Sequence, residues 1–413
     1  MPFRIALSGL NAATTDLEVT GNNIANAATN GFKESRAEFA NLFASAVQDT
    51  TVGGGQGVRV AKVAQQFSQG SVDFTSNNLD LAISGEGFFV LESGDGTRSY
   101  TRAGAYSVDR EGFVINHANE RLQVYQAVTG ASGATTFNTG VLQDLTLPTT
   151  PSAPNPTGEL SASLNLNASE VAPTAPFDPN NPASYNSSTS TTVYDSLGNA
   201  HTSTLYFRKT GAGAWQGYQY VDGNVVTSGA PASNFFNLGF STSGALNAPV
   251  GGTVTMNNFN PGGGAADLTL TLDFNGTTQY GSSFAVNNLG QDGFTSGRLA
   301  GVDIDTEGVV FARYTNGQSA ALGKVALAKF NNNQGLRQIG DTNWAESFQS
   351  GNVQLGEAGT SSFGQIQSGA LESSNVDIAE QLVNLITAQR NFQANSEVIS
   401  SADAITQTII NIR

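Results

Sequence analysis

The chain has 413 residues, a net charge of −15 and only 12% charged side chains, while glycine alone contributes 47 residues. A chain of this length exceeds one hydrophobic core, so we expect two or three domains. The acidic balance, without a cluster of Lys and Arg, argues against a nucleic-acid partner and an anionic membrane surface. The absence of cysteine excludes disulfides, thiol nucleophiles and Cys-ligated zinc.

The first predicted element is an amphipathic helix in the N-terminal segment 1–30. Apolar residues recur there at heptad spacing, with Thr14 and Gly21 in the remaining positions: Phe3, Leu7, Leu10, Leu17, Ile24 and Ala28. We expect the helix to end near Asn30-Gly31, because Asn and Gly tolerate the left-handed conformation at a helix C-terminus. The apolar stripe is too narrow to stabilise a lone helix, so a partner is needed.

The same segment does not resemble a cleaved signal peptide. Its apolar residues are interrupted by Ser8, Gly9, Asn11, Thr14 and Thr15. No apolar run approaches the ~18 residues that a membrane span requires. We therefore expect no membrane insertion, and export, if it occurs, without a cleaved signal peptide.

The next part of the chain is expected to be β-structure built from two separated halves. Residues 31–70 and 355–371 are predicted as extended connectors, and 71–145 with 286–354 as an inner β domain. Strand-like runs lie at 81–83, 87–91, 100–102, 112–115, 301–304, 309–312 and 325–330. Two hairpin turns, 108–112 and 304–308, share Asp, a second acidic residue and Gly. Their likeness suggests one domain interrupted by an insertion.

A change in composition marks that insertion. Prolines gather between residues 146 and 190, at Pro148, Pro151, Pro154, Pro156, Pro173, Pro176, Pro179 and Pro182. Such segments are extended and loop-like. We place an outer inserted β domain at 146–285, with strands expected at 191–195, 202–208, 215–221 and 268–274.

A second long helix is predicted in the C-terminal segment 372–413. Asn375 offers a cap, and Asp377 and Glu380 lie in the first turn, where the helix dipole favours acidic groups. The apolar positions are Ile378, Leu382, Leu385, Ala388, Phe392, Ile399, Ala402, Ile405 and Ile409. Pairing of the two helices gives the predicted fold class: mainly β with long terminal α-helices, in which helical coiled-coil ends accompany two nested β domains, the outer inserted in the inner.

Candidate catalytic and metal-binding residues are scarce. His117 and His201 have no neighbour at metal-ligand spacing, so each is expected on the surface or in a turn. Residues 303–308 match the first half of a calcium loop, but Tyr314 stands where that loop needs Glu, and a hairpin turn explains the same residues. No nucleophile elbow or phosphate loop is present. We predict no catalytic residue, no cofactor and no metal, hence no enzyme.

Several sequence blocks resemble the axial proteins of the bacterial flagellar rod and hook. Blocks at 21–33, 69–70, 78–89, 100–104, 369–377 and 389–395 follow the order of that family. Their signature residues are Asn22, Asn23, Asn26, Thr29, Gly31, Phe32, Asn375, Asp377, Gln389 and Arg390. The insertion, together with 193–201, 314–318 and 327–336, is similar to the hook branch. Distal rod proteins share the ends but are much shorter.

The resemblance implies a structural subunit of the flagellar hook, which self-assembles into a curved flexible tube and transmits motor torque from rod to filament as a universal joint. It implies partners: further copies of the chain, the distal rod, hook cap and hook-filament junction proteins, and the flagellar export apparatus. It also implies an extracellular location in the basal body and hook. In this family the terminal helices pack against neighbouring subunits, so the apolar helix positions become subunit-assembly residues.

Other readings stay open. A distal rod subunit is an alternative within the same family. A secreted β-rich adhesin is an alternative of a different class, motivated by the body rich in Gly, Asn and Thr, and an enzyme is a third. Two hypotheses accompany the hook reading: the ends of free subunits are disordered until assembly, and the domain 146–285 tunes tube curvature.

Overall fold

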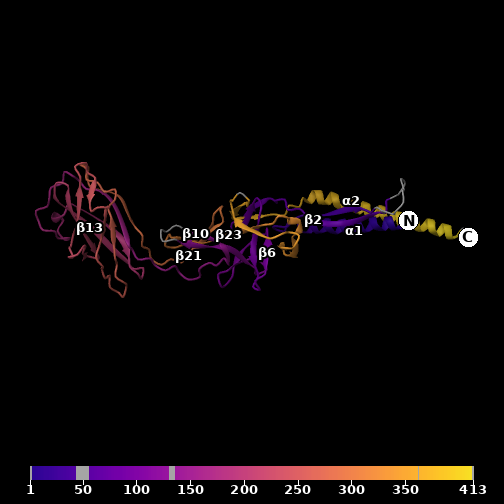
Figure 1. Ribbon diagram of the computed structural model, residues 1–413, viewed down its shortest axis with the longest axis horizontal. Coiled ribbons are helices and arrows are strands. Elements are labelled where there is room, and N and C mark those ends of the chain that lie inside the picture. Colours follow the sequence, from indigo (N-terminus) through magenta and orange to yellow (C-terminus); the bar gives the residue numbers. More distant parts are fainter. Residues whose placement is uncertain (1, 43–54, 130–134, 361, 412–413) are drawn as a thin grey trace. The chain divides into compact units, whose positions relative to one another are not determined.

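The computed structural model describes residues 2–42, 55–129, 135–360 and 362–411. The predicted fold class is confirmed, since strands dominate and two terminal helices, α1 (Pro2–Ala25) and α2 (Ile378–Asn411), pack together (Figure 1). The chain forms two compact units, one of residues 1–149, 301–313 and 319–413, the other of 150–300 and 314–318. The finer division into helical core, connectors and β domains stays a prediction.

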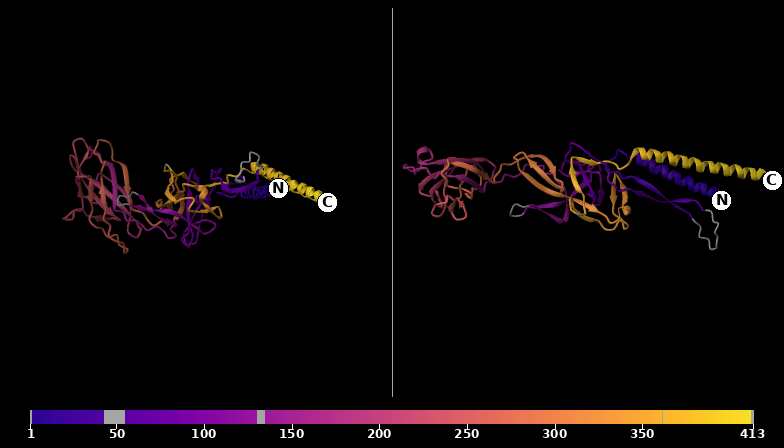
Figure 2. Two further views of the ribbon diagram at one scale, coloured as in Figure 1. Left: turned by 45° about the vertical axis from the view of Figure 1, so that its right-hand side comes forward. Right: turned by 90° about the horizontal axis from the view of Figure 1, so that it is seen from above.

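The two helices run antiparallel, side by side (Figure 2). Gly9, near the start of α1, lies against Asn395 in the second half of α2, whereas Asn23, near the end of α1, bonds to Gln381 near the start of α2. Helix α1 ends at Ala25, earlier than expected, because the Asn26 side chain donates to the Asn22 carbonyl oxygen and the backbone continues in turns. At the start of α2, Asp377 Oδ1 accepts from the Ala379 N–H at 2.8 Å, which is the capping arrangement of a helix N-terminus.

A hairpin of β1 (Ser35–Asn41) and β2 (Val58–Gln65) follows α1. It occupies much of the predicted connector 31–70, and the segment joining its strands lies largely outside the described residues. Helix α1 rests on it, and the Val58 N–H donates to Ser8 Oγ at 3.1 Å. Two short pairs bring the start and end of the chain together: β3 (Val72–Phe74) with β28 (Ala370–Glu372), and β4 (Leu81–Ser84) with β27 (Gln365–Ser368).

The principal sheet of the first unit has the order β21–β22–β23–β9–β5–β6–β25–β24, with β10 and β8 paired to β9, β26 to β23 and β7 to β8. Its strands are β5 (Phe88–Glu92), β6 (Arg98–Thr101), β7 (Ser107–Val108), β8 (Val114–Ile115), β9 (Arg121–Thr129), β10 (Thr135–Asp144), β21 (Leu299–Ile304), β22 (Val309–Tyr314), β23 (Ser319–Lys329), β24 (Arg337–Gly340), β25 (Asn343–Ala345) and β26 (Gln354–Glu357). Strand β23 pairs with both β5 and β9, so the halves of the chain on either side of the insertion form one sheet. Phe88, Tyr100 and Trp344 are buried at its core.

The second unit contains two sheets that share one core. The first sheet has the order β18–β19–β11–β20 and the second β12–β13–β14–β16–β17, with β15 on β14. Its strands are β11 (Glu159–Asn165), β12 (Ser187–Tyr194), β13 (Ala200–Gly211), β14 (Ala214–Val221), β15 (Asn224–Val226), β16 (Phe236–Phe240), β17 (Leu246–Ala248), β18 (Thr253–Thr255), β19 (Thr271–Asp273) and β20 (Ala285–Gln291). Leu164, Phe207, Trp215 and Phe274 meet in the core. This unit continues to residue 300, beyond the boundary expected at 285, because β20 pairs with β11.

One Asp-centred turn occurs three times in the described ranges of the chain. Asp109, Asp195 and Asp305 each accept two backbone N–H bonds through Oδ1, from the residues two and four positions later. The glycine three positions after each Asp has a positive φ of 93°, 83° and 82°, a conformation that glycine adopts without a steric penalty. The Asp305 carboxylate is thus used in a hairpin turn, which explains the calcium-like sequence 303–308.

Candidate assembly site

The seam between α1 and α2 is made of small and polar side chains. Ala6 and Ala13 of α1 and Ala388 of α2 are buried, on the helical stripes that also carry Gly9 and Asn395. A Cβ atom on Gly9 would come within 2.3 Å of Asn395 Oδ1. Small side chains let the helix backbones approach closely, which leaves the larger apolar side chains beside the seam.

The apolar positions predicted from heptad spacing lie beside this seam. Five are exposed, with fractions between 43% for Leu7 and 61% for Ile405: Phe3, Leu7, Ile378, Leu382 and Ile405. Six are half-buried: Leu10, Leu17, Ile24, Leu385, Phe392 and Ile399. The side chain of Ile409 lies outside the described residues. Heptad spacing therefore predicted large apolar residues at the helix contact, whereas the α1–α2 seam within the chain is formed by small residues.

Sequence reasoning missed four exposed apolar side chains on the helices. They are Ile5, Val383, Ile386 and Val398. Ile386 follows the predicted Ile378 and Leu382 at intervals of four residues, so a search for a second apolar stripe on the C-terminal helix would have found it. Both helices therefore present apolar surface that the described part of the chain leaves uncovered, and covering such surface is worth about 25 cal/mol per Å².

One buried carboxylate joins three distant segments at the roots of the helices, by which we mean the C-terminal end of α1 and the N-terminal end of α2. Glu372, at the end of β28, receives Lys33 Nζ at 2.5 Å and Arg102 Nη1 at 3.1 Å. The Gly70 N–H also donates to Glu372 Oε1 at 3.0 Å. The side chains of Lys33 and Glu372 are fully buried. Burial lowers the pKa of the Lys33 ammonium and of the Arg102 guanidinium, and Glu372 opposes both shifts.

The backbone around this ion cluster is equally close-packed. Gly31, with φ +71°, would place a Cβ atom 2.4 Å from the Ala103 backbone nitrogen, and its N–H donates to the Glu372 carbonyl oxygen at 2.7 Å. Gly104 would place a Cβ atom 1.8 Å from the Leu81 carbonyl oxygen. Both positions require glycine, which accounts for their presence in the sequence blocks around 31 and 104.

Two amides complete the connection between helices and hairpin. Asn23 Nδ2 donates to the Ser35 carbonyl oxygen at 2.7 Å and to Gln381 Oε1 at 3.1 Å, while its Oδ1 accepts from the Ser35 N–H at 2.9 Å. Asn375 Oδ1 accepts from the Glu34 N–H at 2.8 Å, and its Nδ2 donates to the Gln66 carbonyl oxygen at 2.8 Å. The roots of both helices are thus hydrogen-bonded to the open end of the β1–β2 hairpin, at Ser35 and at the flanking residues Glu34 and Gln66.

The remaining signature residues divide between three places. Asn22, Asn26, Thr29 and Phe32 line a pocket of about 420 Å³ beside the end of α1. Asp377 caps α2. Gln389 and Arg390 are exposed on α2, away from the ion cluster. The structure therefore brings Asn23, Gly31 and Asn375 to the helix roots and leaves Gln389 and Arg390 apart.

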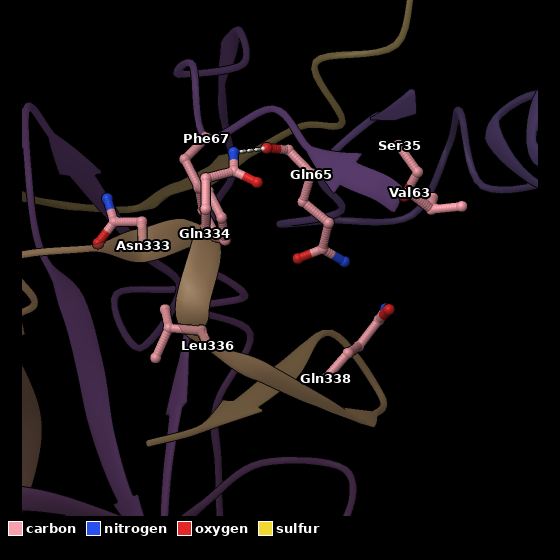
Figure 3. A pocket seen from close by; sticks show the side chains of 8 residues that line it. All are labelled: Ser35, Val63, Gln65, Phe67, Asn333, Gln334, Leu336 and Gln338. Atoms are coloured by element: carbon pink, nitrogen blue, oxygen red, sulfur yellow. Dashed lines mark hydrogen bonds between the residues drawn. The ribbon is translucent and has the colours of Figure 1, made fainter. Parts of the chain in front are cut away.

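Another hollow of about 220 Å³ lies beside β2 (Figure 3). Its lining is Ser35, Val63, Gln65, Phe67, Asn333, Gln334, Leu336 and Gln338. Gln334 Nε2 donates to the Gln65 carbonyl oxygen at 2.5 Å. The lining contains no acid, base or thiol, and the volume is below the ~300 Å³ at which small-molecule sites begin. This arrangement gives the hollow no catalytic chemistry.

The two histidines differ in environment. The His201 side chain is only 12% exposed and lies between Asp222, 2.6 Å from Nδ1, and Asp195, 3.3 Å from Nε2. His201 was expected on the surface or in a turn, and it is half-buried at the start of β13 beside the Asp195 turn. Sequence spacing does not show that Asp222 comes across from the neighbouring strand end. His117 is largely exposed, 3.7 Å from Asp341. Among the residues described, no group of three or more His, Cys, Asp or Glu side chains could hold a metal ion.

In the described ranges of the chain, no helix is both long and apolar enough to cross a membrane. The chain combines β-sheets with two paired terminal helices, and the outer sides of these helices expose apolar side chains. This combination is typical of subunits that associate with other chains.

Family models place this chain among flagellar proteins. Four models match, in chain order: Flagella basal body rod protein (3–33), Flagellar hook protein FlgE/F/G D1 domain (82–155), Flagellar basal body protein FlaE D2 domain (165–294) and Flagellar basal body rod FlgEFG protein C-terminal (367–412).

Full-length relatives agree. The flagellar hook proteins FlgE of Escherichia coli strain K12 and Salmonella typhimurium strain LT2 are each 39% identical, with all of both chains covered. That of Borreliella burgdorferi is 32% identical, with 98% of each chain covered. The crystal structure of Helicobacter pylori flagellar hook protein FlgE2 matches with a TM-score of 0.55 and 15% identity, covering 73% of this chain and 100% of that one. The chain belongs to the flagellar hook protein family, FlgE, and its role is that of a structural subunit of the hook.

Proposed function

We propose that copies of this chain polymerise through the outer sides of α1 and α2 into a curved, flexible hook tube that transmits motor torque from rod to filament. The proposal rests on one observation: small residues form the seam between α1 and α2, whereas large apolar side chains beside this seam are exposed. Every copy presents the same surfaces, and a head-to-tail contact that does not close into a ring generates an open helical polymer.

The predicted helix positions then act as assembly residues. Phe3 and Leu7 on α1 and Ile378, Leu382 and Ile405 on α2 become buried against neighbouring copies. Burying one such side chain stabilises an interface by roughly 1.5–3 kcal/mol. Repeated in every subunit, these contacts hold the helical layer of the tube together. Torque passes from that layer to the β units through the buried ion cluster at Glu372.

Family membership supports a finer setting, which is part of the proposal. We place the protein outside the cell, in the basal body and hook, delivered by the flagellar export apparatus. The tube joins the distal rod at one end and the hook–filament junction proteins at the other, and grows beneath the hook cap. No enzymatic activity, cofactor or metal is part of this role.

The second unit is proposed to tune curvature. A bent rotating tube requires outer contacts that exchange readily, and polar, hydrated contacts between Gly-, Asn-, Ser- and Thr-rich surfaces do so. Removing residues 150–300 should therefore leave assembly intact and give straight tubes. Tubes of unchanged curvature would refute this part of the proposal.

Electron microscopy of basal bodies from cells that lack the chain tests the role itself. Complete rods without a hook support it, truncated rods would make the chain a rod subunit, and intact curved hooks would overturn it in favour of a separate secreted function, such as adhesion. In cells complemented with variants, Leu382→Asp should abolish hooks, because it puts a charge into the helix contact. Asn391→Asp, exposed on the side of α2 opposite Leu382, is the matched control and should assemble.

A further inference from the structure

The outer side of α2 carries one cation within its apolar residues. Arg390 is exposed and lies one helical turn after the exposed Ile386 and two turns before the exposed Val398. Within the described ranges of the chain, its guanidinium makes no hydrogen bond or ion pair. When this side of α2 is covered by a neighbouring copy, the guanidinium loses water, and such a loss is unfavourable unless a carboxylate replaces it.

Helix α1 offers a carboxylate in the opposite situation. Asp16 is half-buried, next to the buried Ala12, Ala13 and Thr20 on the seam side of α1. No donor or cation contacts it among the residues described, and burial raises the pKa of its carboxyl. The antiparallel register that sets Gly9 beside Asn395 places Asp16 level with Ala388. Arg390 of the same chain, two residues further along α2, projects away from the seam.

We infer that Arg390 of one copy pairs with Asp16 of the next copy, beside the seam in which the small residues Ala13 and Ala388 are buried. This inference rests on the proposed assembly through the helices. The two unfavourable situations cancel when the groups meet: the half-buried carboxylate gains a donor, and the covered guanidinium gains a counter-charge. The contact is heterologous, because each copy uses Arg390 toward one neighbour and Asp16 toward another.

Cysteine crosslinking tests the pairing directly, because the natural chain has no cysteine. Full-length chain carrying Asp16→Cys and Arg390→Cys is assembled into hooks, mildly oxidised and run on a denaturing gel. A ladder of covalent multimers supports the proposal. Glu18→Cys with Arg390→Cys is the matched control, since Glu18 is exposed on another side of α1. A ladder from the Glu18 pair but none from the Asp16 pair overturns the proposal, and so does a covalent dimer without higher multimers.

Charge reversal supplies a second readout. Arg390→Glu should reduce the number of hooks per cell by about tenfold or more, as expected for a buried charge left unpaired. Asp16→Arg in the same chain should restore them, and Glu18→Arg should not. Circular dichroism of each purified subunit checks that it folds. If the unaltered chain builds hooks but Asp16→Arg fails to rescue, the ion pair is wrong and the hook role stands. If cells lacking the chain keep their hooks, the role itself fails.

Discussion

Replacing Glu372 by Gln is the most informative single change at the helix roots. The substitution keeps the shape of the side chain but leaves the Lys33 ammonium and the Arg102 guanidinium buried without their shared carboxylate. Breaking a buried ion pair from one side costs about 3–5 kcal/mol. We take about 4 kcal/mol, a large part of the 5–15 kcal/mol by which domains are stable.

Urea unfolding of the full chain measures this loss separately in each unit. The two tryptophans report independently, because Trp344 is buried in the first unit and Trp215 in the second. In the Trp215→Phe background, Glu372→Gln should lower the urea midpoint of the Trp344 transition by about 2 M, given slopes of about 1–3 kcal/mol/M. In the Trp344→Phe background, Glu372→Gln should leave the urea midpoint of the Trp215 transition unchanged.

Two controls make the reasoning refutable. Glu38→Gln removes the exposed partner of Arg36 and Lys62, and exposed pairs contribute only about 0–1 kcal/mol. Replacing Lys33 and Arg102 by Met and Glu372 by Leu removes all three charges together and should recover most of the loss, as for other buried ionic clusters exchanged for apolar ones. If Glu372→Gln shifts stability no more than Glu38→Gln does, the cluster is not the connection described here.

Three further outcomes are expected. Gly31→Ala should destabilise the first unit by about 3 kcal/mol, because the position combines a positive φ with a backbone clash at Ala103. Gly96→Ala is the control, since Gly96 has φ +81° but nothing within 4 Å, and it should cost about 1 kcal/mol. Equal losses of stability in the two variants would contradict the clash. Burial of the His201 ring lowers its pKa, but Asp222 and Asp195 outweigh this and raise it above 6.5. The stability that the ion pairs of His201 contribute to folding is therefore fully present below pH 6.5, and it is lost as the pH rises through the raised pKa of His201. Thermal unfolding of the second unit should show this loss. His201→Gln should abolish the pH dependence. Amide exchange on free subunits should show residues 3–28 weakly protected, because a seam of small residues buries little apolar area, and protection should appear in assembled hooks; strong protection in the free subunit would refute this.

Sequence periodicity predicted the elements better than the contacts between them. Short runs rich in aromatic and β-branched residues indicated the strands around Phe89, Phe207 and Trp215. Strand β13 buries every second side chain around Phe207, whereas Phe88 to Leu91 of β5 are all buried. Two terminal helices followed equally from heptad spacing. The hairpin β1–β2 did not, since its strands carry few large apolar residues and most of its side chains remain exposed or half-buried.

The helix roots show why the site could be only partly predicted. Lys33, Arg102 and Glu372 all lie in the sequence blocks that resemble the rod and hook family, yet no spacing rule links positions 33, 102 and 372. Their meeting depends on tertiary pairing, β28 with β3 and the turn at Gly31 against Ala103. Likewise, the seam relies on Gly9 and Ala388, which a search for large apolar residues passes over.

The place where the chain enters and leaves the second unit has a practical consequence. The Ser152 N–H donates to the Gly297 carbonyl oxygen at 2.7 Å, and Asn155 and Phe294 exchange two backbone bonds of 2.9 Å each. Entry and exit thus run side by side, which is the geometry of a removable cassette. A foreign domain with adjacent termini could be grafted between these passages, so that a growing hook would display enzymes or antigens at regular intervals along a bacterial tube.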